Sequence, residues 1–173
     1  MTNNDKIKEA FFKVKACGWV ESRRRNNTGI GKTFEDYVGV VENNLDEPDL
    51  FGYEIKSHRS ESSSYVTLFT KSPSYPPNGA NAYLKDKFGE LYPNSTYKKL
   101  HTSMFANSYN SYKDIYSFRL INERSEEKIY IGVYDYQTKE LLSKEVFYTY
   151  SDLQQIMKKK LNNLSFASSL CRF

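Results

Sequence analysis

Apolar residues in the first part of the chain recur three and four positions apart. The segment 5–16 has this spacing and stops before Gly18, which predicts an amphipathic helix. Residues 32–43 show the same spacing and predict a second helix. The pattern then changes. Apolar and polar residues alternate in 51–57 and again in 65–71, which predicts two strands that pair antiparallel.

The second half of the chain carries shorter patterns. Prolines, a glycine and asparagines in 72–81 predict a long loop, which could lie over a substrate groove. Further elements are predicted in this order: short helices at 80–88 and 95–103, strands at 115–121, 128–135 and 144–150, and a last helix that runs to about residue 162. Ser151 or Asp152 is expected to cap that last helix. No repeat or linker interrupts 1–173, which predicts a single domain.

Composition excludes several classes of protein. The chain has 173 residues, of which 39% are hydrophobic and 16% aromatic, so it can bury a core and is not a disordered segment. Its apolar runs are too short to span a membrane, and the first residues lack the apolar core of a signal peptide. Cys17 and Cys171 lie far apart and lack metal-site spacing, which favours reduced thiols in a cytoplasmic protein.

The distribution of charge is more informative than the net charge of +4. Between Lys32 and Lys56 there is no basic residue, but there are seven acidic ones. Basic residues flank this acidic stretch at Arg23, Arg24, Arg25, Lys32, Lys56 and Arg59. An acidic centre inside a basic rim suits a metal site that acts on a polyanion. A solvated acidic helix and loop would give the same pattern.

The acidic stretch ends in Pro48-Asp49, followed by Glu54-Ile55-Lys56. In a strand, Glu54 and Lys56 point to one face and Ile55 to the other, while Asp49 lies at the strand entry. Two carboxylates that converge on one point suit Mg²⁺, and a neighbouring lysine can hold a water molecule or offset charge on a phosphate. This pattern matches the PD-(D/E)xK nuclease motif. An ordinary surface ion pair on a strand is the alternative interpretation.

Other motifs carry less chemistry. Residues 29–33 resemble the end of a phosphate-binding loop, but Asn26 stands where that loop needs a glycine and no apolar strand precedes it, which excludes an NTPase. Glycine-rich backbone that opens a helix can still bind a DNA phosphate through its amides. His58 and His101 are too few and too far apart for a histidine metal site.

Several basic residues are candidates for DNA contact. We expect Arg23, Arg24, Arg25 and Lys32 to contact phosphates, although a basic run can also be a solvated surface. His58 shares a strand face with Lys56, which makes it a candidate for DNA contact or an ordinary histidine at the end of a strand. Lys71 ends the strand expected to pair with the motif strand. It therefore borders the site or is a surface lysine.

Three stretches together resemble the MvaI/BcnI family of type II restriction endonucleases, which are related to the mismatch-repair nicking enzyme MutH. The first runs from Gly18-Trp19 through Asn27-Thr28-Gly29-Ile30-Gly31-Lys32-Thr33-Phe34-Glu35-Asp36. The second comprises Asn44-Leu45-Asp46, Pro48-Asp49 and Glu54-Ile55-Lys56, and the third is Thr67-Leu68-Phe69-Thr70-Lys71-Ser72-Pro73. The match is dense over about residues 17–81 and continues loosely to about residue 162.

The resemblance implies a restriction-endonuclease-like α/β fold, with a central mixed sheet flanked by helices. It implies that Asp49 and Glu54 are metal ligands, Lys56 is the catalytic lysine and Glu35 is an additional acid that supports the metal and its water. It also implies that the protein acts with Mg²⁺, as a monomer, on double-stranded DNA, and that a DNA methyltransferase of the same restriction-modification system is a partner.

Members of this family continue after the helix that here ends near residue 162, and that portion supplies much of their base recognition. This chain stops at Phe173. We therefore expect the C-terminal recognition lobe to be missing or truncated, and DNA binding to be weak, salt-sensitive and largely independent of sequence. Two alternatives remain open: a DNA-binding or inactive remnant of such an endonuclease, and a globular protein whose ion-paired strand is structural.

Overall fold

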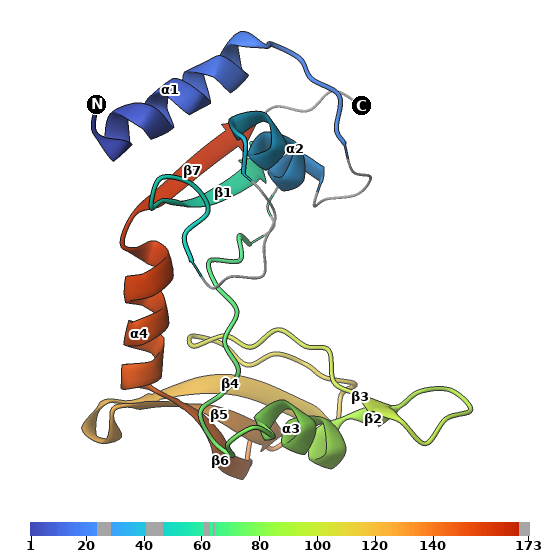
Figure 1. Cartoon of the computed structure of the whole chain (residues 1–173). Helices are drawn as coiled ribbons and strands as arrows, with labels where there is room; N and C mark the ends of the chain where they lie inside the picture. The colour runs from blue at the N-terminus through green and yellow to red at the C-terminus, as the bar shows by residue number, and fades with distance from the viewer. Residues whose placement is uncertain (24–28, 41–46, 61–62, 64, 170–173) are drawn as a thin grey trace. The chain divides into compact units, whose positions relative to one another are not determined.

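The computed structural model describes residues 1–23, 29–40, 47–60, 63 and 65–169 (Figure 1). The chain forms two compact units. Unit 1 comprises Met1–Thr70 and Ile156–Phe173, and unit 2 comprises Lys71–Gln155. The expectation that 1–173 form one nuclease domain stays a prediction.

Unit 1 begins with two helices. Helix α1 spans Asn3–Ala16 and starts with a capping box, in which Thr2 and Asp5 satisfy each other's backbone amides. Helix α2 spans Gly29–Val38, so it starts earlier and ends earlier than 32–43. Gly39 ends it with a φ of 84°, a left-handed conformation that glycine adopts readily.

A two-stranded parallel sheet lies beside these helices. Strand β1 spans Glu54–Arg59 and pairs in register with β7, Leu164–Ser169 (Figure 1). The predicted strand 51–57 therefore starts too early, because Phe51 and Gly52 form a turn. Helix α2 packs closely against one face of β1, since a Cβ at Gly31 would lie 3.3 Å from Ser57 Oγ. Ile55 is buried on this same face.

The predicted antiparallel partner of β1 is wrong. Residues 65–71 contain neither helix nor strand, and within the described residues β1 pairs only with β7. Alternation in 65–71 is a local signal, whereas the partner of a parallel strand comes from a distant part of the chain. Sequence reasoning assigned no element to the residues after 162, and so it missed β7.

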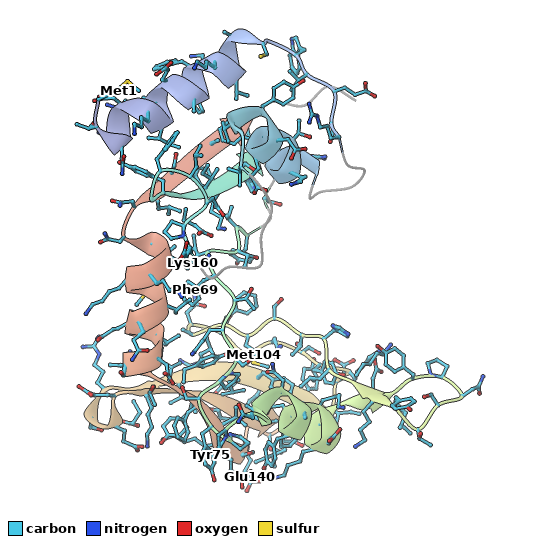
Figure 2. All side chains as sticks on the ribbon, in the orientation of Figure 1. Met1, Phe69, Tyr75, Met104, Glu140 and Lys160 are labelled. Atoms are coloured by element: carbon cyan, nitrogen blue, oxygen red, sulfur yellow. The ribbon has the colours of Figure 1, made fainter. Side chains whose placement is uncertain are left out.

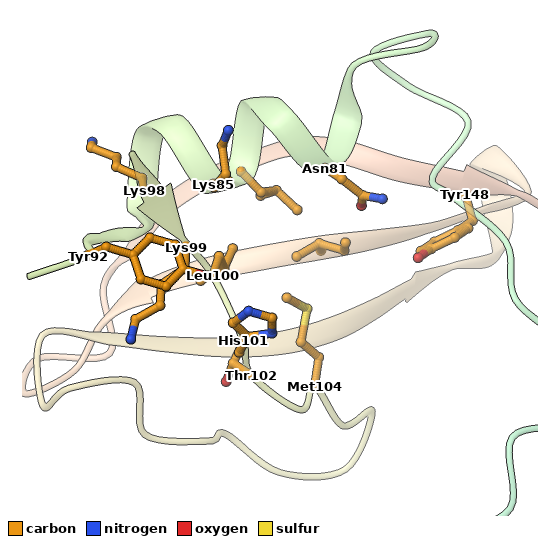
Figure 3. A pocket seen from close by; sticks show the side chains of 12 residues that line it. Asn81, Lys85, Tyr92, Lys98, Lys99, Leu100, His101, Thr102, Met104 and Tyr148 are labelled. Atoms are coloured by element: carbon orange, nitrogen blue, oxygen red, sulfur yellow. The ribbon is translucent and has the colours of Figure 1, made fainter. Parts of the chain in front are cut away.

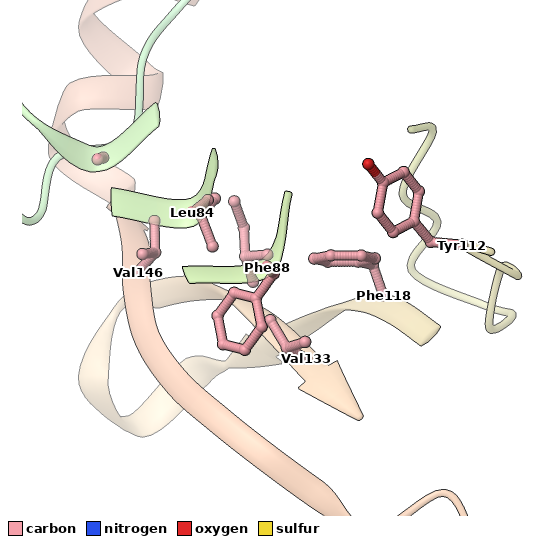
Figure 4. Close-up of a cluster of buried hydrophobic side chains, with 8 residues drawn as sticks. Leu84, Phe88, Tyr112, Phe118, Val133 and Val146 are labelled. Atoms are coloured by element: carbon pink, nitrogen blue, oxygen red, sulfur yellow. The ribbon is translucent and has the colours of Figure 1, made fainter. Parts of the chain in front are cut away.

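Unit 2 is built on a three-stranded antiparallel meander. Its strands are β4 (Tyr116–Glu123), β5 (Lys128–Asp135) and β6 (Leu141–Thr149), with a short 3₁₀ turn at Arg124–Glu126. Helix α3, Ala80–Phe88, packs on this sheet (Figures 1 and 4). The core cluster consists of Ala80, Leu84, Phe88, Tyr112, Phe118, Ile131, Val133 and Val146. These strands and α3 confirm the predicted elements.

The predicted helix at 95–103 is wrong. This segment instead contributes β3, Lys98–Lys99, which pairs antiparallel with β2, Glu90–Leu91. The pairing with β2 holds Lys98 and Lys99 in extended backbone, and the tight loop that joins the two strands includes Asn94, which has a left-handed φ of 56°. The loop closes through a hydrogen bond of 2.9 Å from the Tyr92 amide to the Tyr97 carbonyl.

Helix α4 spans Tyr150–Leu161, close to the predicted bounds. The cap is Thr149, not Ser151 or Asp152. Its hydroxyl accepts a hydrogen bond of 3.2 Å from the Asp152 amide, which places Asp152 in the first turn. No described helix has the length and apolar character needed to cross a bilayer.

Unit 2 also contains a cavity of about 590 Å³ beside α3 (Figure 3). Leu84, Leu100, Met104 and Ile131 supply apolar lining, and Lys85, Lys98, Lys99 and His101 supply basic lining. Lys98 Nζ donates to the Asp86 carbonyl at 2.5 Å, and Lys99 Nζ lies 3.5 Å from Glu90. Protein groups therefore already hold these two ammonium ions.

Gly89, at the end of α3, gives a test of how closely α3 packs against β3. A Cβ added at Gly89 would lie 2.3 Å from the Lys85 carbonyl oxygen and 2.6 Å from that of Lys99. Because both atoms are backbone, we expect Gly89→Ala to destabilise unit 2 by about 1–3 kcal/mol. Gly79→Ala is the control, since its nearest neighbour would lie at 3.8 Å. Hydrogen exchange of the amides in β4–β6 measures the difference, and equal exchange in both variants would contradict the packing.

Candidate active site

The approach to β1 is a tight hairpin turn. Leu50 and Tyr53 exchange two backbone hydrogen bonds, of 3.1 and 2.8 Å. The turn residues Phe51 and Gly52 have φ angles of 51° and 79°, as a type I′ turn requires, and glycine is favoured at its second position. Since Leu50 pairs with Tyr53, the next residues outward, Asp49 and Glu54, lie opposite each other.

Asp49 is held by a backbone amide on the open edge of β1, which is the edge that does not pair with β7. On the paired edge, the Glu54 amide donates to the Asn163 carbonyl at 2.9 Å. The next amide, that of Ile55, points to the other edge, where it donates to Asp49 Oδ2 at 2.7 Å. Among the described residues no strand pairs with this second edge, and the Asp49 carboxylate supplies the acceptor there. The turn and this hydrogen bond together set the position of Asp49 at the start of β1.

Glu54 is a buried carboxylate with 4% of its surface exposed. Its Oε1 accepts a hydrogen bond of 2.5 Å from Lys56 Nζ, and its Oε2 lies 3.4 Å from Lys160 Nζ. Lys160 is also held by the Glu47 carbonyl, at 2.9 Å. Two lysines therefore compensate one buried negative charge, each at a different oxygen.

The second carboxylate oxygen of Glu54, Oε2, accepts no hydrogen bond. Oε2 is buried and has no hydrogen-bond partner, because the Lys160 contact lacks hydrogen-bond geometry. A buried polar atom without a partner is rare and marks strain, function or a bound ion. Asp49 Oδ1 also accepts no hydrogen bond from the described residues, so each carboxylate keeps an available oxygen.

These oxygens fit a hard divalent cation. Mg²⁺ is bound in proteins by one or two carboxylates, with water and substrate phosphate completing its coordination. The described residues contain no cluster of three or more acidic, histidine or cysteine side chains that could enclose a metal ion. The site thus fits a metal that shares its coordination with substrate. A closed structural metal site would need more protein ligands.

Glu35 belongs to the helix that packs on β1. It is half-buried and lies one helical turn after Gly31, the residue that approaches Ser57. Strand alternation places Ser57 on the face opposite Glu54 and Lys56. The role of Glu35 as an additional acid stays a prediction.

Two of the predicted DNA-binding residues share one carboxylate. Arg23 Nη1 lies 3.6 Å and Lys32 Nζ 3.1 Å from Asp36. The Arg23 guanidinium also lies 5.1 Å from the centre of the Tyr37 ring, and its side chain is 58% exposed. Lys32 is 16% exposed and therefore far less accessible. Arg24 and Arg25 lie outside the described residues.

The remaining predicted contacts are divided between the two units. His58 lies on the face of β1 that carries Glu54 and Lys56, and its ring centre is 6.5 Å from that of Phe166. Lys71 belongs to unit 2 and is not in a strand, so the expectation that it ends a strand paired with β1 is wrong. A hydrogen bond from Ser74, with a smaller contribution from the Lys71 charge, lowers the pKa of Asp152. DNA contact by His58 and Lys71 stays a prediction.

Sequence reasoning missed Lys160. It is the last of three consecutive lysines at the end of α4, where basic residues are favoured by the helix dipole (Figure 2). The helix dipole is enough to explain why all three lysines occur at this position. The contact with Glu54 joins residues more than a hundred positions apart, so no spacing within the sequence reveals it.

An acidic residue at a strand entry, followed by a strand that carries an acid-x-lysine triplet, is the arrangement of the PD-(D/E)xK class of nucleases. The model of the MvaI/BcnI restriction endonuclease family matches residues 8–172. This chain therefore belongs to the MvaI/BcnI restriction endonuclease family.

Solved structures that are similar to the chain include two of the restriction endonuclease MvaI. The restriction endonuclease MvaI in complex with its cognate DNA substrate is 33% identical, with a TM-score of 0.89, and the match covers 98% of this chain and 68% of that one. MvaI in the absence of DNA is also 33% identical, with a TM-score of 0.59 and coverages of 92% and 63%. No curated protein matches. The predicted family and the restriction-endonuclease-like α/β fold are confirmed.

The bond between Asp49 and Ile55 can be tested by stability alone. Asp49→Ala leaves the Ile55 amide without its acceptor, and we expect a loss of about 1.5–3 kcal/mol, since the acceptor is charged. Asp49→Asn retains a side-chain oxygen at the same place and should lose less. Hydrogen exchange at the Ile55 amide reports the bond directly. Similar stability of Asp49→Ala and the wild type would contradict it.

Proposed function

We propose that the protein is a Mg²⁺-dependent endonuclease that hydrolyses phosphodiester bonds of double-stranded DNA. The observation that carries this proposal is the buried Glu54 carboxylate, with one oxygen held by Lys56 and the other without a hydrogen bond, opposite Asp49. Membership of a restriction endonuclease family supports it, as does the similarity to an enzyme solved with its cognate DNA substrate.

Asp49 and Glu54 are the proposed metal ligands. When bound there, Mg²⁺ would polarise the scissile phosphate and lower the pKa of an attacking water. Asp49 is suited to this task because the Ile55 amide holds one of its oxygens and orients the other. Glu54 is suited because burial removes competing water from its carboxylate. Glu35 is proposed as the acid that supports the metal and its water from α2.

Lys56 is the proposed catalytic lysine. Its ammonium group donates to Glu54 Oε1 at 2.5 Å, and this contact supports a role in which Lys56 holds a water molecule beside the metal ligands or offsets charge on the phosphate. Its side chain is 23% exposed, so the charge is only partly screened by solvent. An ammonium group fixed in this way needs little reorganisation during the reaction.

The DNA would be held mainly through its phosphates. Arg23 and Lys32 are proposed contacts because their positive charges lie close together beside Asp36, and the Arg23 side chain is 58% exposed. Arg24, Arg25, His58 and Lys71 are proposed contacts on the basis of sequence. We further propose that the protein acts as a monomer, and that a DNA methyltransferase of the same system protects the host DNA.

Replacing the catalytic lysine tests the proposed chemistry. We expect Lys56→Ala to slow Mg²⁺-dependent conversion of supercoiled plasmid to the nicked form by at least about a hundredfold, because it removes the ammonium group beside the metal ligands. Lys158→Ala is the matched control, since Lys158 is exposed and lies in the last turn of α4. EDTA should stop nicking by both the wild type and the control. Equal rates for the wild type and Lys56→Ala would contradict the proposed role of Lys56, and equal rates for the wild type and Asp49→Ala would show that the nicking comes from a contaminant.

The salt dependence of DNA binding tests the proposed phosphate contacts. Each contact releases about one counterion, so we expect Arg23→Gln and Lys32→Gln each to reduce the slope of log K against log salt by about one unit. Both changes should weaken binding equally on unrelated duplexes, because phosphate contacts carry no sequence information. Lys139→Gln in unit 2 is the control. Unchanged slopes in both variants would assign Arg23 and Lys32 to a structural cluster with Asp36.

A further inference from the structure

The Glu54 carboxylate is compensated at two places that are not equivalent. At Oε1 the Lys56 contact is a hydrogen-bonded ion pair of 2.5 Å. At Oε2 the Lys160 contact is 3.4 Å long and has no hydrogen-bond geometry. The first is a strong contact, while the second is mainly Coulombic. Oε2 is therefore the oxygen at which a bound cation could replace the lysine as the neighbouring positive charge.

Lys160 is held near this oxygen from a separate part of the chain. It lies in the last turn of α4, its side chain is 16% exposed, and its ammonium group donates to the Glu47 carbonyl at 2.9 Å. The carbonyl is neutral, so this hydrogen bond holds the Lys160 ammonium group beside Glu54 without adding a negative charge of its own. This charge would lie next to any cation bound at Oε2.

We propose that Lys160 is the counter-ion of Glu54 in the metal-free protein, and that it competes with a divalent cation for Oε2. Lys160 is thus a positioning residue that acts through Glu54. This inference rests on the metal site of the proposed function. It assigns opposite effects to one side chain, because Lys160 stabilises the buried carboxylate without metal and opposes metal binding through like-charge repulsion.

The test is calorimetric titration of the full chain with Mn²⁺, in the absence of DNA, together with thermal unfolding with and without the metal. We expect Lys160→Met to unfold at a temperature roughly 5 °C or more below that of the wild type when no metal is present. The same variant should bind Mn²⁺ about threefold or more tightly, because one nearby positive charge is removed. Metal should therefore raise its unfolding temperature more than it raises that of the wild type.

Lys158→Met is the matched control, since it removes the same charge from the same helix end at an exposed position. It should change neither the metal-free unfolding temperature nor the affinity for Mn²⁺. Should Lys160→Met fail to fold, the double variant Glu54→Gln with Lys160→Met provides the answer. We expect the double variant to recover stability, because it buries neither charge.

Unchanged or weaker Mn²⁺ binding by Lys160→Met would overturn the inference, as would a double variant no more stable than Lys160→Met. The inference would also be overturned if the wild type bound no Mn²⁺, or if Glu54→Gln left its affinity for Mn²⁺ unchanged. A wild-type protein that binds Mn²⁺ at Glu54 and shows the expected effect of Lys160→Met, yet cuts no DNA, would contradict the proposed function and leave the role of Lys160 intact.

Discussion

The burial of one carboxylate, that of Glu54, is the constraint on which the site depends. Removing an ionised carboxylate from water costs several kcal/mol even after the protein relaxes, so it requires compensating charges close by. Unit 1 supplies them from two directions, with Lys56 from the same strand and Lys160 from the end of α4. Both lysines act on an acid that has 4% of its surface exposed. The low local polarity that makes this arrangement costly also strengthens electrostatic interactions with a bound cation or phosphate.

The strand that carries Glu54 is itself held by residues far away in the sequence. Its paired edge is completed by β7, and its open edge begins with the hydrogen bond between Asp49 and Ile55. The I′ turn at Phe51-Gly52 brings Asp49 back across from Glu54. Each of these contacts stabilises the fold and also sets the geometry of the proposed metal ligands. A substitution here therefore affects both properties, which is why stability must be measured beside activity.

Much of this arrangement could be predicted from sequence. Helical spacing indicated α1 and α4, and alternation indicated β4, β5 and β6, because in these elements the local pattern and the tertiary contacts agree. The motif residues Asp49, Glu54 and Lys56 were identified because acid-x-lysine on a strand has a chemical meaning. The resemblance carried by residues 17–81 gave the family, which the comparison confirmed.

The failures share a physical cause. Residues 65–71 alternate but form no strand, because the pairing that would select a strand is made by β7 instead. The segment 95–103 forms no helix, because Lys98 and Lys99 pair with Leu91 and Glu90 in the hairpin of β2 and β3. Lys160 lies at the end of a helix, where a lysine is expected, so its sequence position does not indicate its contact with Glu54. In all three cases a contact with another segment of the chain decides the outcome, and the pattern within the segment itself does not encode that contact.

The most direct measurement of the metal site is paramagnetic broadening of backbone amide signals by Mn²⁺, titrated into the metal-free protein. Our account places the ion at Asp49 and Glu54, so the amides of Glu54 and Ile55 should broaden at the lowest metal concentration, and Glu54→Gln should abolish the effect. Early broadening elsewhere, for example around Asp36 or Asp152, with the amides of Glu54 and Ile55 unaffected, would contradict the assignment of the active site.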